Sequence, residues 1–153
     1  MKYLTDSLSI KGRMLKNRIV VPPMADLGQI NEDGYINERH LQHYRSLAEG
    51  GAGLVIVEAS AVSKMAEPRN TIQIYDDRFI PGMTELASVI RENHAVALVQ
   101  LLNTGLSIMP EDEIKDISRE QFLQYKSDFI SAASRCKKSG FDGVELHAAH
   151  GYY

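Results

Sequence analysis

The residues best suited to chemistry gather near the end of the chain. The run E-L-H-A-A-H-G-Y (Glu145–Tyr152) brings together two imidazoles and a phenol, separated by small side chains. Imidazoles donate hydrogen bonds and exchange protons near neutral pH, and a phenol can act as a general acid. The His-x-x-His spacing could also serve a metal-dependent hydrolase, but it differs from the helical zinc pattern and no third ligand is evident. We therefore predict that His147, His150 and Tyr152 form a functional site without a metal, and a metal-dependent hydrolase that uses the two histidines is the alternative.

An amide in the middle of an apolar segment is the second candidate. Gln100 interrupts the run VALVQLL (Val96–Leu102). Burying an amide without partners costs about 1–3 kcal/mol, so Gln100 is expected to form hydrogen bonds. An amide donates and accepts, which suits the edge of a heterocyclic cofactor, but a structural bond to a neighbouring loop would satisfy it equally well.

Two further segments could border a bound group. P-P-M-A (Pro22–Ala25) and E-A-S-A (Glu58–Ala61) each follow an apolar run. The prolines end a strand because they fix φ and cannot donate to a sheet. Small side chains leave room for a flat cofactor, although simple packing explains them too. Glu58 is interpreted as a buried, paired carboxylate rather than as a catalyst.

The elements that position these residues alternate between strands and helices. Four apolar runs predict strands at Arg18–Val21, Leu54–Val57, Val96–Leu102 and Gly143–Leu146. The first three show little polar alternation, which predicts burial on both faces of a parallel sheet. An additional short hairpin at Leu8–Asn17 is expected to close the floor of a barrel.

Three helices are expected between these strands. Asn37 caps the first, which ends at Gly50, and Pro81 lies in the first turn of the second. A capping box beginning at Ser118 opens the third, which ends at Gly140. The side chains expected on its inner face are Phe122, Tyr125, Phe129, Ala132, Ala133 and Cys136.

The alternation predicts right-handed β-α-β units and an α/β fold. The segment after the first strand lacks the glycine pattern of a dinucleotide-binding doubly wound sheet. Strands that repeat every roughly 36–47 residues favour a parallel (β/α)8 TIM barrel, which typically needs about 250 residues. The 153-residue chain would then form about the first four strands, a half-barrel, without an internal domain boundary.

Composition excludes several classes of function. A net charge of −3 argues against a nucleic-acid partner, and the single cysteine excludes an internal disulfide. There is no apolar run of the roughly 20 residues that a membrane span needs, and the amino terminus has no signal-peptide pattern. The expected location is the cytoplasm.

The motifs together resemble the old yellow enzyme, or NADH:flavin oxidoreductase, family, in its bacterial ene-reductase branch. The matching segments are LKNRIVVPPM (Leu15–Met24), GLVIVEASAV (Gly53–Val62), Gln100-Leu101 and GFDGVELHAAHGYY (Gly140–Tyr153). The resemblance implies FMN as cofactor, NAD(P)H as reductant and a small-molecule enone or enoate as substrate. It also implies that 1–153 is the amino-terminal half of one FMN-binding barrel domain.

The resemblance also implies roles for single residues. Pro23, Met24 and Ala25 would line the flavin, with Ala59 nearby, and Gln100 would bond to its pyrimidine edge. His147 and His150 would hold the substrate carbonyl, and Tyr152 would lie at the proton-donor position.

Two local departures from the family pattern are visible. Asn103 and Leu106 stand where the family often has a histidine and an arginine, and Ala25 stands where the bacterial branch often has a redox-tuning cysteine.

The short length is the largest departure, because the family's phosphate-binding loops come from later strands. A truncated half-barrel of this kind is expected to bind FMN weakly or not at all and to be inactive alone. The alternative is a non-catalytic half-barrel that self-associates as a homo-oligomer to cover its open edges.

Overall fold

The computed structural model describes residues 3–25, 33–64, 71–103 and 117–150. A hairpin of β1 (Leu8–Ile10) and β2 (Arg13–Leu15) precedes a mainly parallel α/β unit. That unit runs β3 (Val20–Val21), α1 (Glu38–Glu49), β4 (Leu54–Ala61), β5 (Ile72–Gln73), the 3-10 turn η2 (Asp77–Phe79), α2 (Ile80–Arg91), β6 (Val96–Leu102), α4 (Arg119–Lys138) and β7 (Gly143–Leu146). In the described part of the chain, no helix has the length and apolar character needed to cross a membrane.

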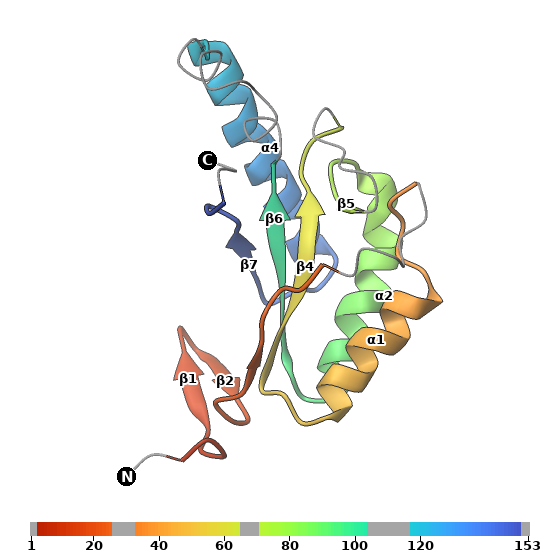
Figure 1. Ribbon diagram of the computed structural model, residues 1–153, viewed down its shortest axis with the longest axis vertical. Helices are drawn as coiled ribbons and strands as arrows, with labels where there is room; N and C mark the ends of the chain where they lie inside the picture. Colours follow the sequence, from red (N-terminus) through yellow and green to blue (C-terminus); the bar gives the residue numbers. More distant parts are fainter. Residues whose placement is uncertain (1–2, 26–32, 65–70, 104–116, 151–153) are drawn as a thin grey trace.

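The strand order decides between the two parallel folds considered from the sequence. The sheet runs β3-β4-β6-β7, every pair is parallel, and the short β5 adds to the end of β4. Each β-α-β crossover therefore moves to the next strand in the same direction (Figure 1). A doubly wound sheet reverses this direction at a switch point, whereas a barrel does not. The order confirms the half-barrel prediction.

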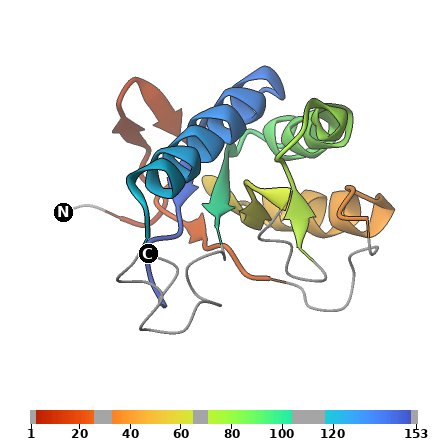
Figure 2. The same ribbon diagram turned by 90° about the horizontal axis from the view of Figure 1, so that it is seen from above.

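The described helices α1, α2 and α4 pack on one face of the sheet, as Figure 2 shows in the view from above. The main core lies between them and includes Tyr44 of α1, Leu86 of α2, Val57 of β4 and Val99 of β6. Cys136 of α4 belongs to the same cluster, where burial raises the pKa of its thiol to about 12. This thiol is therefore a core side chain rather than a reactive one.

Side-chain caps set the starts of α1 and α4 at the residues expected from the sequence. The side chain of Asn37 accepts hydrogen bonds from two amides of the first turn of α1, and His40 Nδ1 accepts from the amide of Asn37. Ser118 and Gln121 form the corresponding reciprocal pair at the start of α4. These bonds satisfy amides that a helix start leaves without partners.

The opposite, inner face of the sheet is covered mainly at its amino-terminal end. There Leu15 of the hairpin packs against Leu54 and Ile56 and is 1% exposed. Asp142 accepts a hydrogen bond from the amide of Ala97 and pairs with Arg13 of the hairpin. The expected floor of the barrel is thus confirmed, and it joins the hairpin to two strands.

Burial on both faces was predicted for the first three strands, and this is only partly correct, because Val20 of β3 is 47% exposed. Every described residue of β4 except Ala59 is buried. In β6 burial alternates, because Val96, Leu98 and Gln100 face the inner side and are only half-buried. The hairpin covers the floor but does not extend over the whole inner face.

The first half of α4 is the clearest error of the sequence interpretation. Phe122 was expected to face inward, but its side chain is 61% exposed. The reason is visible in Figure 1, where the first turns of α4 extend past the end of the sheet. Only the later turns, with Phe129, Ala132 and Cys136, contact the core.

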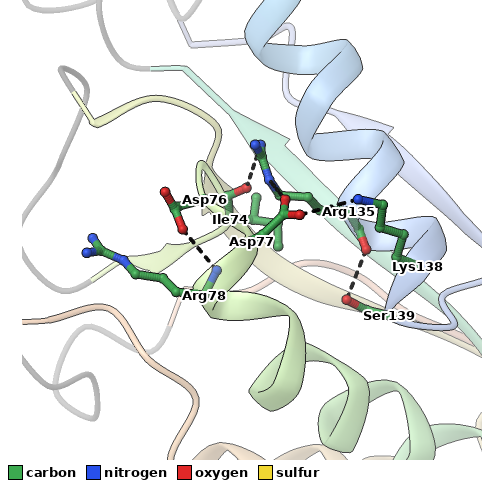
Figure 3. Close-up of polar contacts among 7 residues, drawn as sticks. All are labelled: Ile74, Asp76, Asp77, Arg78, Arg135, Lys138 and Ser139. Atoms are coloured by element: carbon green, nitrogen blue, oxygen red, sulfur yellow. Dashed lines mark hydrogen bonds and ion pairs between the residues drawn. The ribbon is translucent and has the colours of Figure 1, made fainter.

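The later turns of α4 are fixed to the segment that precedes α2. Asp77 of η2 pairs with Arg135 and Lys138 of α4, and the guanidinium of Arg135 also donates to the carbonyl of Ile74 (Figure 3). The hydrogen bonds from these two cations lower the pKa of Asp77. Because Asp77 is exposed to water, these ion pairs connect α4 with η2 without burying a charge.

Candidate functional site at the carboxyl ends of the strands

The site is built on the paired strands β6 and β7. Gln100 and Glu145 are direct partners in the parallel register, and Gln100 Nε2 donates to Glu145 Oε1 at 2.8 Å. The side-chain amide of Gln100 is therefore bonded to a residue of the neighbouring strand β7 rather than to a loop. A primary amide has two N–H donors and a carbonyl acceptor, so this bond uses only part of its capacity.

His147 continues the strand ladder beyond the end of β7. Its backbone amide donates to the carbonyl of Leu101 at 3.0 Å, which places His147 at the same end of the sheet as Gln100. The rings of His147 and His150 lie edge to face, with their centroids 5.3 Å apart. The two predicted catalytic histidines are thus close to each other and to the amide-bearing strand.

The electrostatics of the histidine pair favour a neutral ring at His147. Partial burial, followed by the nearby His150, lowers the pKa of His147, while the charge of Glu145 acts in the opposite direction. A neutral imidazole retains one N–H donor. His150 is exposed and has φ of 57°, a left-handed conformation that few residues other than glycine and asparagine adopt readily.

A bulge brings Ala59 to the inner face of β4. The register advances three residues on β4, from Val57 to Ser60, while β6 advances two, so β4 contains one extra residue. This change lets Glu58 turn toward the helices, where Tyr44 donates to its carboxylate and accepts from its amide. The prediction of a buried, paired Glu58 is confirmed, and Ala59 becomes the half-buried inner residue.

The segment after β3 continues along the same end of the sheet. Pro23 is half-buried, and Met24 and Ala25 are exposed, Met24 by 67%. Tyr152 lies outside the described residues, so its predicted position stays a prediction. In the described ranges, no three histidine, cysteine or acidic side chains come close enough together to hold a metal ion.

Glu145 is the residue whose role sequence reasoning missed. The sequence analysis named it only as the first residue of the segment that contains the two histidines. The signal that could have found it was the need of Gln100 for a partner, since a neighbouring parallel strand also has one polar residue in an apolar run. The sequence alone does not give the register between β6 and β7, which places Glu145 directly opposite Gln100.

A sequence model of the family described as NADH:flavin oxidoreductase / NADH oxidase matches residues 4–116 and 110–153. The chain belongs to this family. The NADPH dehydrogenase of Listeria monocytogenes serotype 4a (strain HCC23) is 34% identical over 168 residues, which cover 99% of this chain and 50% of the relative. This member of the NADH:flavin oxidoreductase family therefore spans about half the length of the curated relatives that it matches.

Solved structures agree with this assignment. The Old Yellow Enzyme from Pichia sp. AKU4542 superimposes with a TM-score of 0.84 and 26% identity, over 99% of this chain and 47% of that one. A 2-naphthoyl-CoA reductase gives a TM-score of 0.85 at 21% identity, covering 97% of this chain and 27% of that one, which is a likeness of fold. The described half-barrel is thus about half of a known TIM-barrel chain.

Proposed function

We propose that this chain is the first half of an FMN-dependent NAD(P)H oxidoreductase that reduces electron-poor C=C bonds of enone or enoate substrates. The observation that carries the proposal is the convergence of Gln100 and His147 on the carboxyl ends of paired parallel strands. In TIM barrels this end carries the active site. The name NADPH dehydrogenase, given to the Listeria relatives, supports a nicotinamide reductant.

The residues at this end fit a flat, amide-containing ring. Gln100 retains bonding capacity beyond its contact with Glu145, and it is only half-buried. The bulge presents Ala59, whose small side chain lets a planar group approach the sheet. Pro23, Met24 and Ala25 follow the adjacent strand and would line the other border of the ring. We assign these five residues to FMN binding.

The histidines would act on the substrate. FMN, when bound and reduced by NAD(P)H, supplies the hydride that adds to the β-carbon of the substrate. Negative charge then develops on the substrate carbonyl oxygen, where N–H donors from His147 and His150 stabilise it; one such donor can contribute about 3 kcal/mol. Tyr152 would donate the proton that completes addition at the α-carbon.

Reconstitution of a whole barrel tests this function. The chain would be co-expressed with the remaining half of the Listeria monocytogenes NADPH dehydrogenase and purified through an affinity tag on this chain. We expect flavin absorbance in the two-chain complex, bleaching by NADPH or NADH without oxygen, and recovery of the oxidised spectrum on adding an enone. A complex that forms but contains no flavin would contradict the proposal.

The chain alone is the matched control for that experiment. The chain alone supplies only the proposed FMN-binding residues at β3, β4 and β6. We therefore expect it to bind FMN weakly and to show no catalytic activity. Flavin absorbance that survives gel filtration of the 153-residue chain by itself would refute this expectation.

A second candidate function, self-association without catalysis, is favoured by the outer strands of the sheet. Apolar side chains on both are exposed, Val20 of β3 by 47% and Leu146 of β7 by 56%. In the described residues, β3 pairs only with β4 and β7 only with β6. Open strands with apolar side chains promote association with another chain.

Two lysine substitutions test self-association. Leu146→Lys places a charge on the outer strand β7, and Leu123→Lys makes the same change on α4, where the leucine is similarly exposed at 49%. If the strands associate, the mass measured by light scattering falls to that of a monomer for Leu146→Lys only. A monomeric unmodified chain would eliminate this candidate.

A further inference from the structure

The side chain of Glu145 joins the two parts of the proposed site. It is bonded to the amide of Gln100, and two positions later the backbone of His147 continues the same ladder past the end of β7. We propose that Glu145 is a positioning residue that fixes which end of the Gln100 amide faces the ring-binding side. This inference rests on the proposed function, since it assigns a purpose to the amide orientation.

The chemistry of a carboxylate makes the orientation one-sided. A glutamate side chain is ionised at neutral pH and can then only accept hydrogen bonds. It therefore selects the Nε2 end of Gln100, which is the atom that lies 2.8 Å from its Oε1. The carbonyl and the second N–H of the amide are then directed away from Glu145. The carbonyl can then accept a hydrogen bond, and the second N–H can donate one, to a ring that carries a donor next to an acceptor.

Packing alone would not supply this order. Gln100 is half-buried, and the inner face around it is formed by residues that are also only half-buried. Strand pairing does not need the side-chain bond either. The β6-β7 ladder contains four register pairs and continues through the amide of His147. A single cross-strand pair of side chains adds little to the stability of such a ladder.

Nuclear magnetic resonance on the flavin-free chain tests the orientation directly. In the unmodified protein, we expect the Nε2–H proton of Gln100 that faces Glu145 to resonate further downfield than in Glu145→Gln, because a bond to a carboxylate is charge-assisted. Glu145→Gln keeps the size but removes the charge, so the pKa of His147 should also fall further in this variant. Gln100 side-chain amide signals that are the same in both proteins would overturn the proposal.

A double exchange separates positioning from simple attachment of the strands. Gln100→Glu with Glu145→Gln keeps an amide-carboxylate bond between the strands but exchanges the two groups. In the reconstituted barrel, we expect its melting temperature to match the unmodified protein and its FMN affinity to fall by about tenfold or more, the value of one lost hydrogen bond. Glu145→Gln alone should lose less, because either amide end can then face the ring.

Unchanged FMN affinity in the double exchange would show that the amide orientation has no function and would overturn the proposal. If the unmodified reconstituted barrel binds no FMN, the proposed function fails. The resonance measurement on the flavin-free chain still decides whether Glu145 orients Gln100, so the two failures are distinguishable.

Discussion

The two ends of the sheet differ in how completely their polar and apolar groups are satisfied. At the amino-terminal end, the hairpin buries Leu15, and Asp142 is bonded to both the sheet and the hairpin. At the carboxyl end, Met24 and His150 are exposed, and His150 has a left-handed backbone. The chain thus packs its side chains closely at the floor, and it leaves Met24 and His150 accessible at the carboxyl-terminal end of the sheet, which we call the rim.

Truncating the floor residue should give the largest effect on stability. Leu15→Ala removes a fully buried side chain and is expected to lower the free energy of unfolding by about 2–5 kcal/mol in urea titrations. Met14→Ala, one residue away and 64% exposed, is the control and should change it by less than about 0.5 kcal/mol. Equal losses of stability in the two variants would contradict the claim that the buried Leu15 side chain stabilises the floor.

Removing a rim histidine should affect turnover without affecting stability. His150→Gly eliminates one proposed donor, and kcat/KM of the reconstituted barrel is expected to fall by about 100-fold or more. His94→Gly is the matched control, because His94 has the same φ of 57° and is also exposed, but it lies before β6 at the floor end. Comparable losses in both variants would contradict the assignment of catalysis to the rim.

A buried carboxylate at the floor should contribute more to stability than a multiply paired one on the surface. Asp142→Ala leaves the amide of Ala97 without its side-chain acceptor and is expected to cost about 1–3 kcal/mol of unfolding free energy. Asp77→Ala breaks two ion pairs with α4, but its side chain is 62% exposed and screened by water. We therefore expect the urea midpoint of unfolding of Asp77→Ala to lie close to that of the unmodified protein. A larger loss of stability in Asp77→Ala than in Asp142→Ala would contradict this ranking.

The smallest predicted effect is a shift in the titration of His147. Because its pKa is lowered in the fold, the unfolded chain binds the proton more readily. The stability contribution of the neutral ring is complete above the unfolded value of about 6.5 and is lost as pH falls from there through the lower folded value. His150→Gly should raise the His147 pKa partway, since burial remains, as measured by proton resonances of the ring. A fall in this pKa would contradict the stated cause.

Local sequence signals were sufficient for most of the scaffold. The predicted bounds of β6 and β7 agree with the structure, and Asn37 and Ser118 cap their helices as expected. These features depend on short-range patterns of apolar residues and on side chains that bond to nearby amides. The consecutive strand order also followed from the regular alternation of strands and helices.

The remaining features depend on contacts between distant residues. The bulge beside Ala59 and the bond between Gln100 and Glu145 are set by the register between strands, which the separate segments do not encode alone. Phe122 was misplaced because a helical pattern does not state where the underlying sheet ends. The short β5 was also missed, since two residues carry too little periodicity to be distinguished from a loop.

The central claim is that FMN binds at the rim of this half-barrel, against Gln100, Ala59 and the segment at Ala25. The most direct measurement is a map of amide chemical shifts on adding FMN to the reconstituted two-chain barrel in which only this chain is isotopically labelled. The account predicts shifts at Ala25, at Ala59 and in the side-chain amide of Gln100, with Ala97 and Asp142 at the floor unchanged. Shifts confined to the floor, or no shift at the three rim residues, would contradict it.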